Sequence, residues 1–169
     1  MGLKDEVGRL LRSGDEAALA RTVAGDRRAV RLLTARLWDT DGDVRARAAR
    51  GLGEAAVHHG VLIREIVRRL MWALNDESGT NGAPVLAALG EIGRHAPRIL
   101  APYVSALAAL SADEGLRVDV VTALTAVAAS APGVVAPHWP ALSGAVDCSR
   151  PAERAAQEAL RDTLEGRGV

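Results

Sequence analysis

The sequence predicts an all-α protein built from repeated pairs of helices, and three observations lead to this fold class. Hydrophobic residues make up 49% of the 169 residues, yet aromatic residues make up 2% and Phe is absent. Ala, Leu and Val must therefore form the core. Ala and Leu are strong helix formers, whereas sheets favour aromatic and β-branched side chains. The other two observations are a repeat of about 36 residues and the helical spacing of apolar residues within it.

The repeat appears when the chain is compared with itself. HAPRILAPYVSALAAL (95–110) matches SAPGVVAPHWPALSGA (130–145) at an offset of 35, with both Ala-Pro pairs in register. DGDVRARAARGLGEAA (41–56) matches DEGLRVDVVTALTAVA (113–128) at an offset of 72, which is two repeats. Four leucines recur at the same place in successive units, and we expect all of them to be buried: Leu52, Leu89, Leu124 and Leu160.

Residues 1–25 precede the repeats, and we expect two short helices there, LKDEVGRLLRS and DEAALARTVAG, to cap the array. Four units of two helices follow, and a short tail of residues 166–169 ends the chain, all within one structural domain. The units span residues 26–59, 60–95, 96–131 and 132–165.

The third unit illustrates the two helices of a unit. Pro97 or Pro102 starts the first helix, because proline fixes φ and the first helical turn needs no N–H donor. Asp113 is placed to cap the second helix, and Ala131-Pro132 ends that helix and opens the next unit. The apolar faces of the two helices are Leu100, Val104, Leu107 and Leu110, and then Leu116, Val120, Val121, Leu124 and Val127.

A proline-started helix, L-x-x-L, an Asp turn, V/L-R and A-x-x-x-L together closely resemble the HEAT repeat (HEAT-like, PBS-lyase type) over residues 26–165. The resemblance implies a right-handed α-α superhelix, a HEAT-repeat solenoid of about four helical hairpins plus the N-terminal helical cap. In this family an Asp–Arg pair forms a ladder between neighbouring turns, and two pairs match it: Asp41/Arg45 and Asp113/Arg117. Gly82 and Glu153 stand where the Arg belongs in the other two units, so we expect no continuous ladder.

Such solenoids most often bind macromolecules on the concave side, which the second helices line. The resemblance therefore implies a non-catalytic protein-binding or scaffold module that needs no cofactor and whose partner is another protein. The second helices of the first two units supply the candidate binding residues, which we expect to be exposed: Arg47, Arg50, Glu54, His58, Glu91, Arg94 and His95.

The polar turn N-D-E-S-G-T-N-G (75–82) adds further binding candidates. The surrounding segment RRLMWALNDESG also resembles uncharacterised bacterial HEAT-like proteins, which brings no activity with it. One interpretation is a small polar pocket lined by Arg69, Trp72, Asp76, Glu77 and Ser78. The other is a simple joint, in which Ser78 or Asn81 caps a helix and the glycines supply positive φ.

An enzyme or a nucleic-acid-binding protein is the alternative. Glu54, His58, Glu91 and His95 form two i, i+4 pairs one repeat apart, which would suit a transition metal. HEAT-like deoxyhypusine hydroxylases hold iron with His-Glu dipeptides, which this chain lacks. HEAT-like alkylpurine DNA glycosylases use a basic concave surface with a Trp and an Asp, which Trp38 and Trp72 with Asp39 and Asp76 would mimic. The zero formal net charge argues against nucleic acid.

The remaining features favour a cytoplasmic protein. Cys148 is the only cysteine, so an internal disulfide is impossible. The first residues, MGLKDEVGRLLRSGDE, contain no apolar signal segment, and no run approaches the roughly 18 apolar residues of a membrane span. No G-x-S-x-G motif and no Gly-rich phosphate loop is present, so no catalytic residue is assigned.

Overall fold

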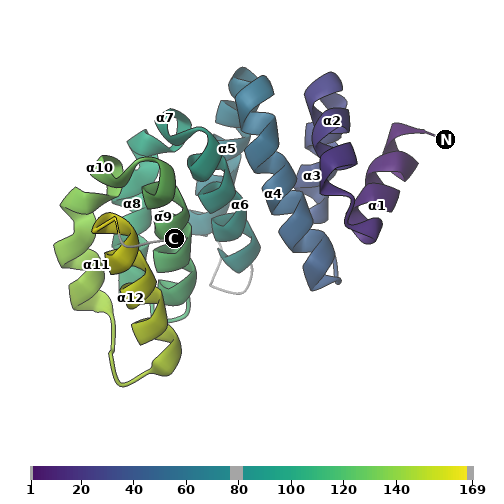
Figure 1. Ribbon diagram of the computed structural model, residues 1–169. Helices are drawn as coiled ribbons and strands as arrows, with labels where there is room; N and C mark the ends of the chain where they lie inside the picture. The colour runs from purple at the N-terminus through teal and green to yellow at the C-terminus, as the bar shows by residue number, and fades with distance from the viewer. Residues whose placement is uncertain (1, 77–81, 167–169) are drawn as a thin grey trace.

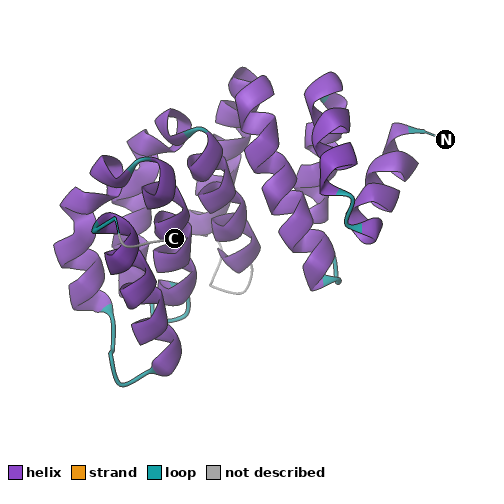
Figure 2. Cartoon of the chain, in the orientation of Figure 1, coloured by secondary structure: helices purple, strands orange, loops and turns teal. Residues whose placement is uncertain are grey.

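The computed structural model describes residues 2–76 and 82–166 of the chain. These residues form helices, short 3-10 segments and turns, and none of them forms a strand (Figure 2). The all-α prediction is therefore confirmed. Among the same residues, no helix has the length and apolar character that crossing a membrane requires. The α-helices are α1 (Leu3–Ser13), α2 (Glu16–Gly25), α3 (Arg28–Arg36), α4 (Gly42–His58), α5 (Gly60–Asp76), α6 (Gly82–His95), α7 (Pro97–Leu100), α8 (Val104–Ala109), α9 (Arg117–Ser130), α10 (Pro132–Val135), α11 (Trp139–Ala145) and α12 (Pro151–Leu164).

The helices pack in two rows (Figure 1). In one row α4 contacts α6, α6 contacts α9, and α9 contacts α12; we refer to these four helices as the α4–α12 row. The other row consists of α3, α5, α7 with α8, and α10 with α11. In it α3 contacts α4, α5 contacts α4 and α6, α7 contacts α6, both α8 and α10 contact α9, and α11 contacts α8. The two N-terminal helices extend the structure, since α2 packs on α4 and α1 contacts α2, α3 and α4.

The core lies between the two rows and is made of small and aliphatic side chains. In α9 the residues at helical spacing on one face are buried, whereas Thr122 on the opposite face is exposed. The repeated leucines are fully buried, as expected from the sequence: Leu52, Leu89, Leu124 and Leu160 each have 0% of their surface exposed.

Glycines set the distance between α6 and α9. A Cβ atom on Gly90 would lie 3.0 Å from the Cα of Ala123, and one on Gly93 would lie 2.5 Å from Cγ2 of Val127. The contact at Gly90 is with the backbone of α9, so a larger residue there requires the two helices to shift by a few tenths of an ångström. At Gly93 the contacts are with the side chains of Val127 and Leu100, which would have to move. Gly90 therefore permits the close contact of the two backbones, and Gly93 leaves room for two neighbouring side chains.

Prolines break the first helices of the third and fourth units into short pieces. α7 begins at Pro97, but Pro102 lies in a 3-10 segment, Ala101–Tyr103, before the chain continues as α8. Pro102 has no N–H to donate to the carbonyl four residues earlier, so the α-helical ladder cannot run through it. Both prolines thus start a helical segment. Pro137 has the same effect in the 3-10 segment between α10 and α11.

The aspartates of the turns behave differently from one another. Asp41 is the N-cap of α4, where its Oδ1 accepts the backbone N–H of Asp43 at 2.8 Å. Asp113 was expected to cap the second helix of its unit, and this prediction is wrong. Its Oδ1 accepts the N–H of Gly115 at 2.8 Å, which forms a separate turn, and α9 begins only at Arg117.

The matching arginines bind the backbone of their own turns. Arg45 Nη1 donates to the carbonyl of Asp39 at 2.7 Å, and Arg117 Nε donates to that of Ser111 at 2.8 Å. In each bond the arginine lies six residues after its carbonyl acceptor, so the turns of the first and third units are held in the same way.

Glu153 replaces an expected Arg and receives the arginine of the preceding unit instead. Its side chain is 4% exposed and lies 3.1 Å from Arg117 Nη1, 36 residues earlier in the chain. Its carboxylate also accepts the backbone N–H of Asp147 at 2.8 Å. The N–H of Asp147 and the guanidinium of Arg117 hold the pKa of Glu153 below its ordinary value.

Leu124→Ala should lower the free energy of unfolding by about 2–5 kcal/mol, because it removes a fully buried side chain and leaves a cavity. Urea unfolding followed by circular dichroism measures the change. Thr122→Ala, at an exposed position of the same helix, is the control and should change stability by no more than about 0.5 kcal/mol. Equal effects of the two substitutions would contradict the packing described for α9.

The ion pair of Glu153 predicts an acid-dependent stability. Because its pKa is lowered in the folded protein, the stabilisation is complete above the ordinary value of 4.5 and is lost as the pH falls below it. Glu153→Gln should therefore be less stable at neutral pH and lose less stability than the unmodified protein on acidification. Urea unfolding at several pH values tests this, with Glu158→Gln, exposed on the same helix, as the control. Parallel acid dependence of Glu153→Gln and the unmodified protein would refute the assignment.

Candidate functional site

A hollow of about 440 Å³, lined by both charged and apolar residues, lies across α2, α4 and α6. We call it the α2–α4–α6 groove. Helical spacing places its residues on one face of each helix, so that the buried face of α4 remains apolar. The groove is lined by Glu16, Leu19 and Ala20 from α2, by Arg47, Arg50, Gly51 and Glu54 from α4, and by Glu91, Arg94 and His95 from α6.

Gly53 brings α4 and α6 close enough for their polar side chains to meet. A Cβ atom on this residue would lie 2.6 Å from Nδ1 of His95 and 2.8 Å from the carbonyl oxygen of Glu91. Alanine would therefore push α6 away from α4. The adjacent Glu54 consequently reaches His95, with Oε1 3.3 Å from Nε2.

His95 is fixed from both sides of its ring. Nδ1 lies 3.0 Å from the carbonyl oxygen of Glu91, and Nε2 faces Glu54. Because a carbonyl oxygen only accepts hydrogen bonds, the Nδ1 contact requires a proton on Nδ1, and the Nε2 contact already engages the carboxylate of Glu54. The ring is thereby oriented along the groove.

The charges of the groove are arranged as ion pairs. Arg50 Nη2 lies 2.7 Å from Oε1 of Glu16, which joins α4 to α2. Arg94 Nε lies 3.5 Å from Oε2 of Glu91 one turn earlier on α6. Both pairs are about half exposed on the arginine side, so each contributes little to stability and can exchange with an external charge at low cost.

Arg47 has a structural role that the sequence did not reveal. Its Nη1 donates to the carbonyl oxygen of Leu11 at 2.8 Å and, more weakly, to that of Arg12 at 3.4 Å. These carbonyls end α1, and such groups lack partners within the helix. Only 23% of the Arg47 side chain is exposed, so the expectation that this side chain is freely exposed is corrected.

The predicted metal constellation is not assembled. Glu54, Glu91 and His95 share the groove, but His58 is exposed and lines a different hollow, where its ring lies 6.4 Å from that of His59. Across residues 2–76 and 82–166, no group of three or more His, Cys, Asp or Glu side chains has an arrangement that could hold a metal ion.

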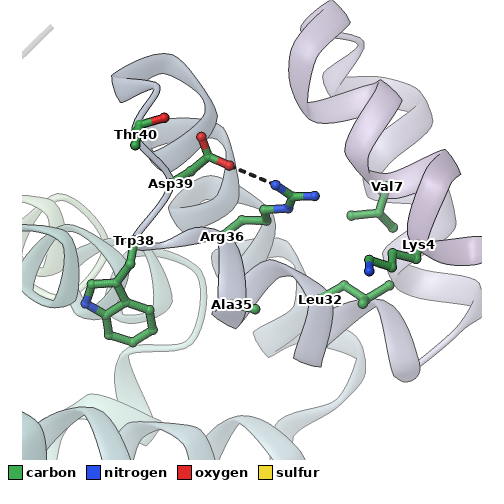
Figure 3. A pocket seen from close by; sticks show the side chains of 8 residues that line it. All are labelled: Lys4, Val7, Leu32, Ala35, Arg36, Trp38, Asp39 and Thr40. Atoms are coloured by element: carbon green, nitrogen blue, oxygen red, sulfur yellow. Dashed lines mark hydrogen bonds and ion pairs between the residues drawn. The ribbon is translucent and has the colours of Figure 1, made fainter.

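Trp38 and Asp39 lie on another part of the surface, in a hollow of about 460 Å³ between α1 and α3. Figure 3 shows Lys4 and Val7 on one side, Leu32 and Ala35 on the other, and Arg36 pointing toward Asp39. The two charged side chains are 2.9 Å apart. The N–H of Asp41 and the guanidinium of Arg36 hold the pKa of Asp39 below its usual value. Both groups bind this carboxylate within the turn between α3 and α4.

The remaining candidates belong to α5 and the turn after it. Arg69 pairs with Glu65 at 3.0 Å, and Trp72 is 69% exposed. Asp76 is the last residue of α5. Glu77 and Ser78 lie outside the described residues, so the choice between a pocket and a joint at residues 75–82 stays open.

Sequence reasoning missed Glu16, the partner of Arg50, and His59, whose Nε2 lies 2.7 Å from the carbonyl oxygen of Val23. The latter contact spans 36 residues, as does the bond from Arg47 to Leu11. The repeat length was therefore a usable signal, since residues one period apart lie on neighbouring turns.

Comparison with known proteins adds no relative: no protein-family model matches the chain, and no curated protein or solved structure matches it.

The two arginines of α4 should differ in their effect on stability. Arg47→Ala should lower the free energy of unfolding by about 1–3 kcal/mol, because the terminal carbonyls of α1 lose a charged donor. Arg50→Ala should change it by no more than about 0.5 kcal/mol, because its ion pair with Glu16 is exposed. Urea unfolding of both variants decides; the assignment is wrong if Arg50→Ala is the more destabilising.

Proposed function

We propose that the chain is a HEAT-like α-solenoid of four helical hairpins behind an N-terminal helical cap. The α4–α12 row would supply the second helices of the hairpins and form the concave face of a right-handed superhelix. Three findings support this proposal: the order of contacts along the row, the burial of the four repeated leucines, and the side-chain bonds that span one period of the sequence.

On this scaffold we propose a non-catalytic module that binds another protein through the α2–α4–α6 groove. The observation that carries this is the set of partly exposed ion pairs on the lining of a hollow between three helices. A protein segment carrying both acidic and basic side chains can replace the internal partners of Arg50 and Arg94 one for one. Electrostatic matching of this kind gives specificity and fast association rather than large affinity.

The balance of charge favours a protein over nucleic acid. The groove contains three arginines and three glutamates, and the whole chain has a formal net charge of zero. Binding to a phosphate backbone relies on an excess of Lys and Arg, which the groove does not offer. One of the three arginines, Arg47, also donates a hydrogen bond to the carbonyl of Leu11 at the end of α1.

The charge reversals Arg50→Glu and Arg94→Glu together should weaken partner binding about tenfold or more, because each places a like charge beside a glutamate and removes a cation from the groove. Affinity purification from the native cell with mass spectrometry identifies the partner. Calorimetry with the purified partner then measures the dissociation constant.

Thr122→Glu, exposed on α9 and outside the groove, is the matched control and should bind normally. All variants must keep the melting temperature of the unmodified protein. A groove variant that binds its partner as tightly as Thr122→Glu does would show that the groove is not the interface.

A further inference from the structure

A second polar hollow, of about 510 Å³, lies where the turn between α2 and α3 meets the junction of α4 and α5. It shares no lining residue with the α2–α4–α6 groove. The polar residues of its lining are mostly basic: Arg27, Arg28, Arg31, His58, His59 and Glu65.

The acidic groups near this hollow are already neutralised. Asp26 binds Arg28 through both carboxylate oxygens, with the shortest contact at 2.7 Å from Nη2, and it also accepts the backbone N–H of Arg28. Glu65 pairs with Arg69 at 3.0 Å. Within residues 2–76 and 82–166, neither the Arg27 side chain nor the Arg31 side chain has a hydrogen-bond or ion-pair partner. Two guanidinium groups therefore present uncompensated charge to one hollow.

The histidines and the start of α5 add to this positive character. His59 is held by its Nε2 contact to Val23, so that its ring forms part of a fixed wall. His58 is exposed beside it and offers a ring N–H donor. α5 begins at Gly60 on the lining, where the helix dipole contributes a partial positive charge.

We propose that this hollow binds a phosphate monoester group. A dianionic phosphate matches the two uncompensated arginines in charge, and its oxygens accept the paired N–H groups of a guanidinium fork. The volume accommodates a small phosphorylated molecule. Val61, which is 81% exposed, and Leu62 provide an apolar wall for the rest of the ligand. This site is separate from the proposed protein-binding groove and does not depend on it.

Titration of the full chain with inorganic phosphate and with glycerol 3-phosphate tests the site, using ¹H–¹⁵N correlation spectra at constant ionic strength. We expect saturable shifts of the amides of residues 26–31 and 58–65, with a dissociation constant of about 1 mM or tighter. Arg27→Gln with Arg31→Gln should raise that constant about tenfold or more, since both fork donors are lost. Arg9→Gln with Arg161→Gln removes the same charge from exposed positions on α1 and α12 and should leave it unchanged.

Vesicles of phosphatidylcholine with and without phosphatidic acid distinguish the source of the phosphate. Sedimentation with the phosphatidic acid vesicles alone, abolished in the Arg27→Gln, Arg31→Gln variant, supports the site with a lipid headgroup as ligand. Binding of glycerol 3-phosphate without sedimentation supports it with a free metabolite. Shifts that do not saturate, or equal affinity in the two double variants when both retain the native spectrum, overturn the proposal.

Discussion

The close approach of α4, α6 and α9 is the constraint on which the rest of the structure depends. A carbon added at Gly53 would collide with the backbone of α6, and one added at Gly90 would lie only 3.0 Å from the backbone of α9. One added at Gly93 would collide with the side chains of Val127 and Leu100. Glycine is a poor helix former, by about 1 kcal/mol relative to alanine at each position. The dispersion contacts of closely packed helices offset that cost. A chain almost without aromatic residues has few other ways to fill its core, since small side chains bury enough surface only when the backbones come near one another.

The same approach produces the polar surface. α4 and α6 each use one face for packing, so the charged residues Arg50, Glu54, Glu91 and Arg94 collect on the other face and line one groove. The contact between Glu54 and His95 exists because Gly53 allows it. Arg47 lies at the edge of this surface and also completes the end of α1. Stability and surface chemistry are thus linked at the border between the N-terminal helices and the first unit.

Much of the helical organisation could be predicted because its signals are local or periodic. Leu52 and its counterparts mark the buried face at every repeat, and Asp41 is followed directly by a helix that it caps. The prediction that Asp113 caps a helix failed because the N–H of Gly115 binds its carboxylate instead. A sequence pattern does not show which N–H is nearest. The arrangement of the hairpins as a superhelix remains a prediction.

The candidate site was predictable to the extent that it follows the repeat. Glu91 and His95 share a helix face, and the repeat offset brings them to Glu54, as the structure shows. His58 ends α4 beside the turn to α5 and lies in the other hollow, because the chain changes direction there. The hydrogen bonds of Arg47 could not be predicted, because their acceptors are backbone carbonyls, which every residue carries.

The side-chain bonds that span one period have an evolutionary consequence. Arg47 reaches Leu11, His59 reaches Val23, Ser130 reaches Gly93 and Arg117 reaches Glu153, each 36 or 37 residues away. Every bond of this set joins two residues about one repeat apart and so links only neighbouring parts of the helix stack. In-frame duplication of one whole unit would therefore create another interface of the same kind and leave the distant ones intact. Deletion of a few residues inside a unit would instead shift the register on both of its sides. Gene duplication by whole repeats is thus the change in length that this packing tolerates.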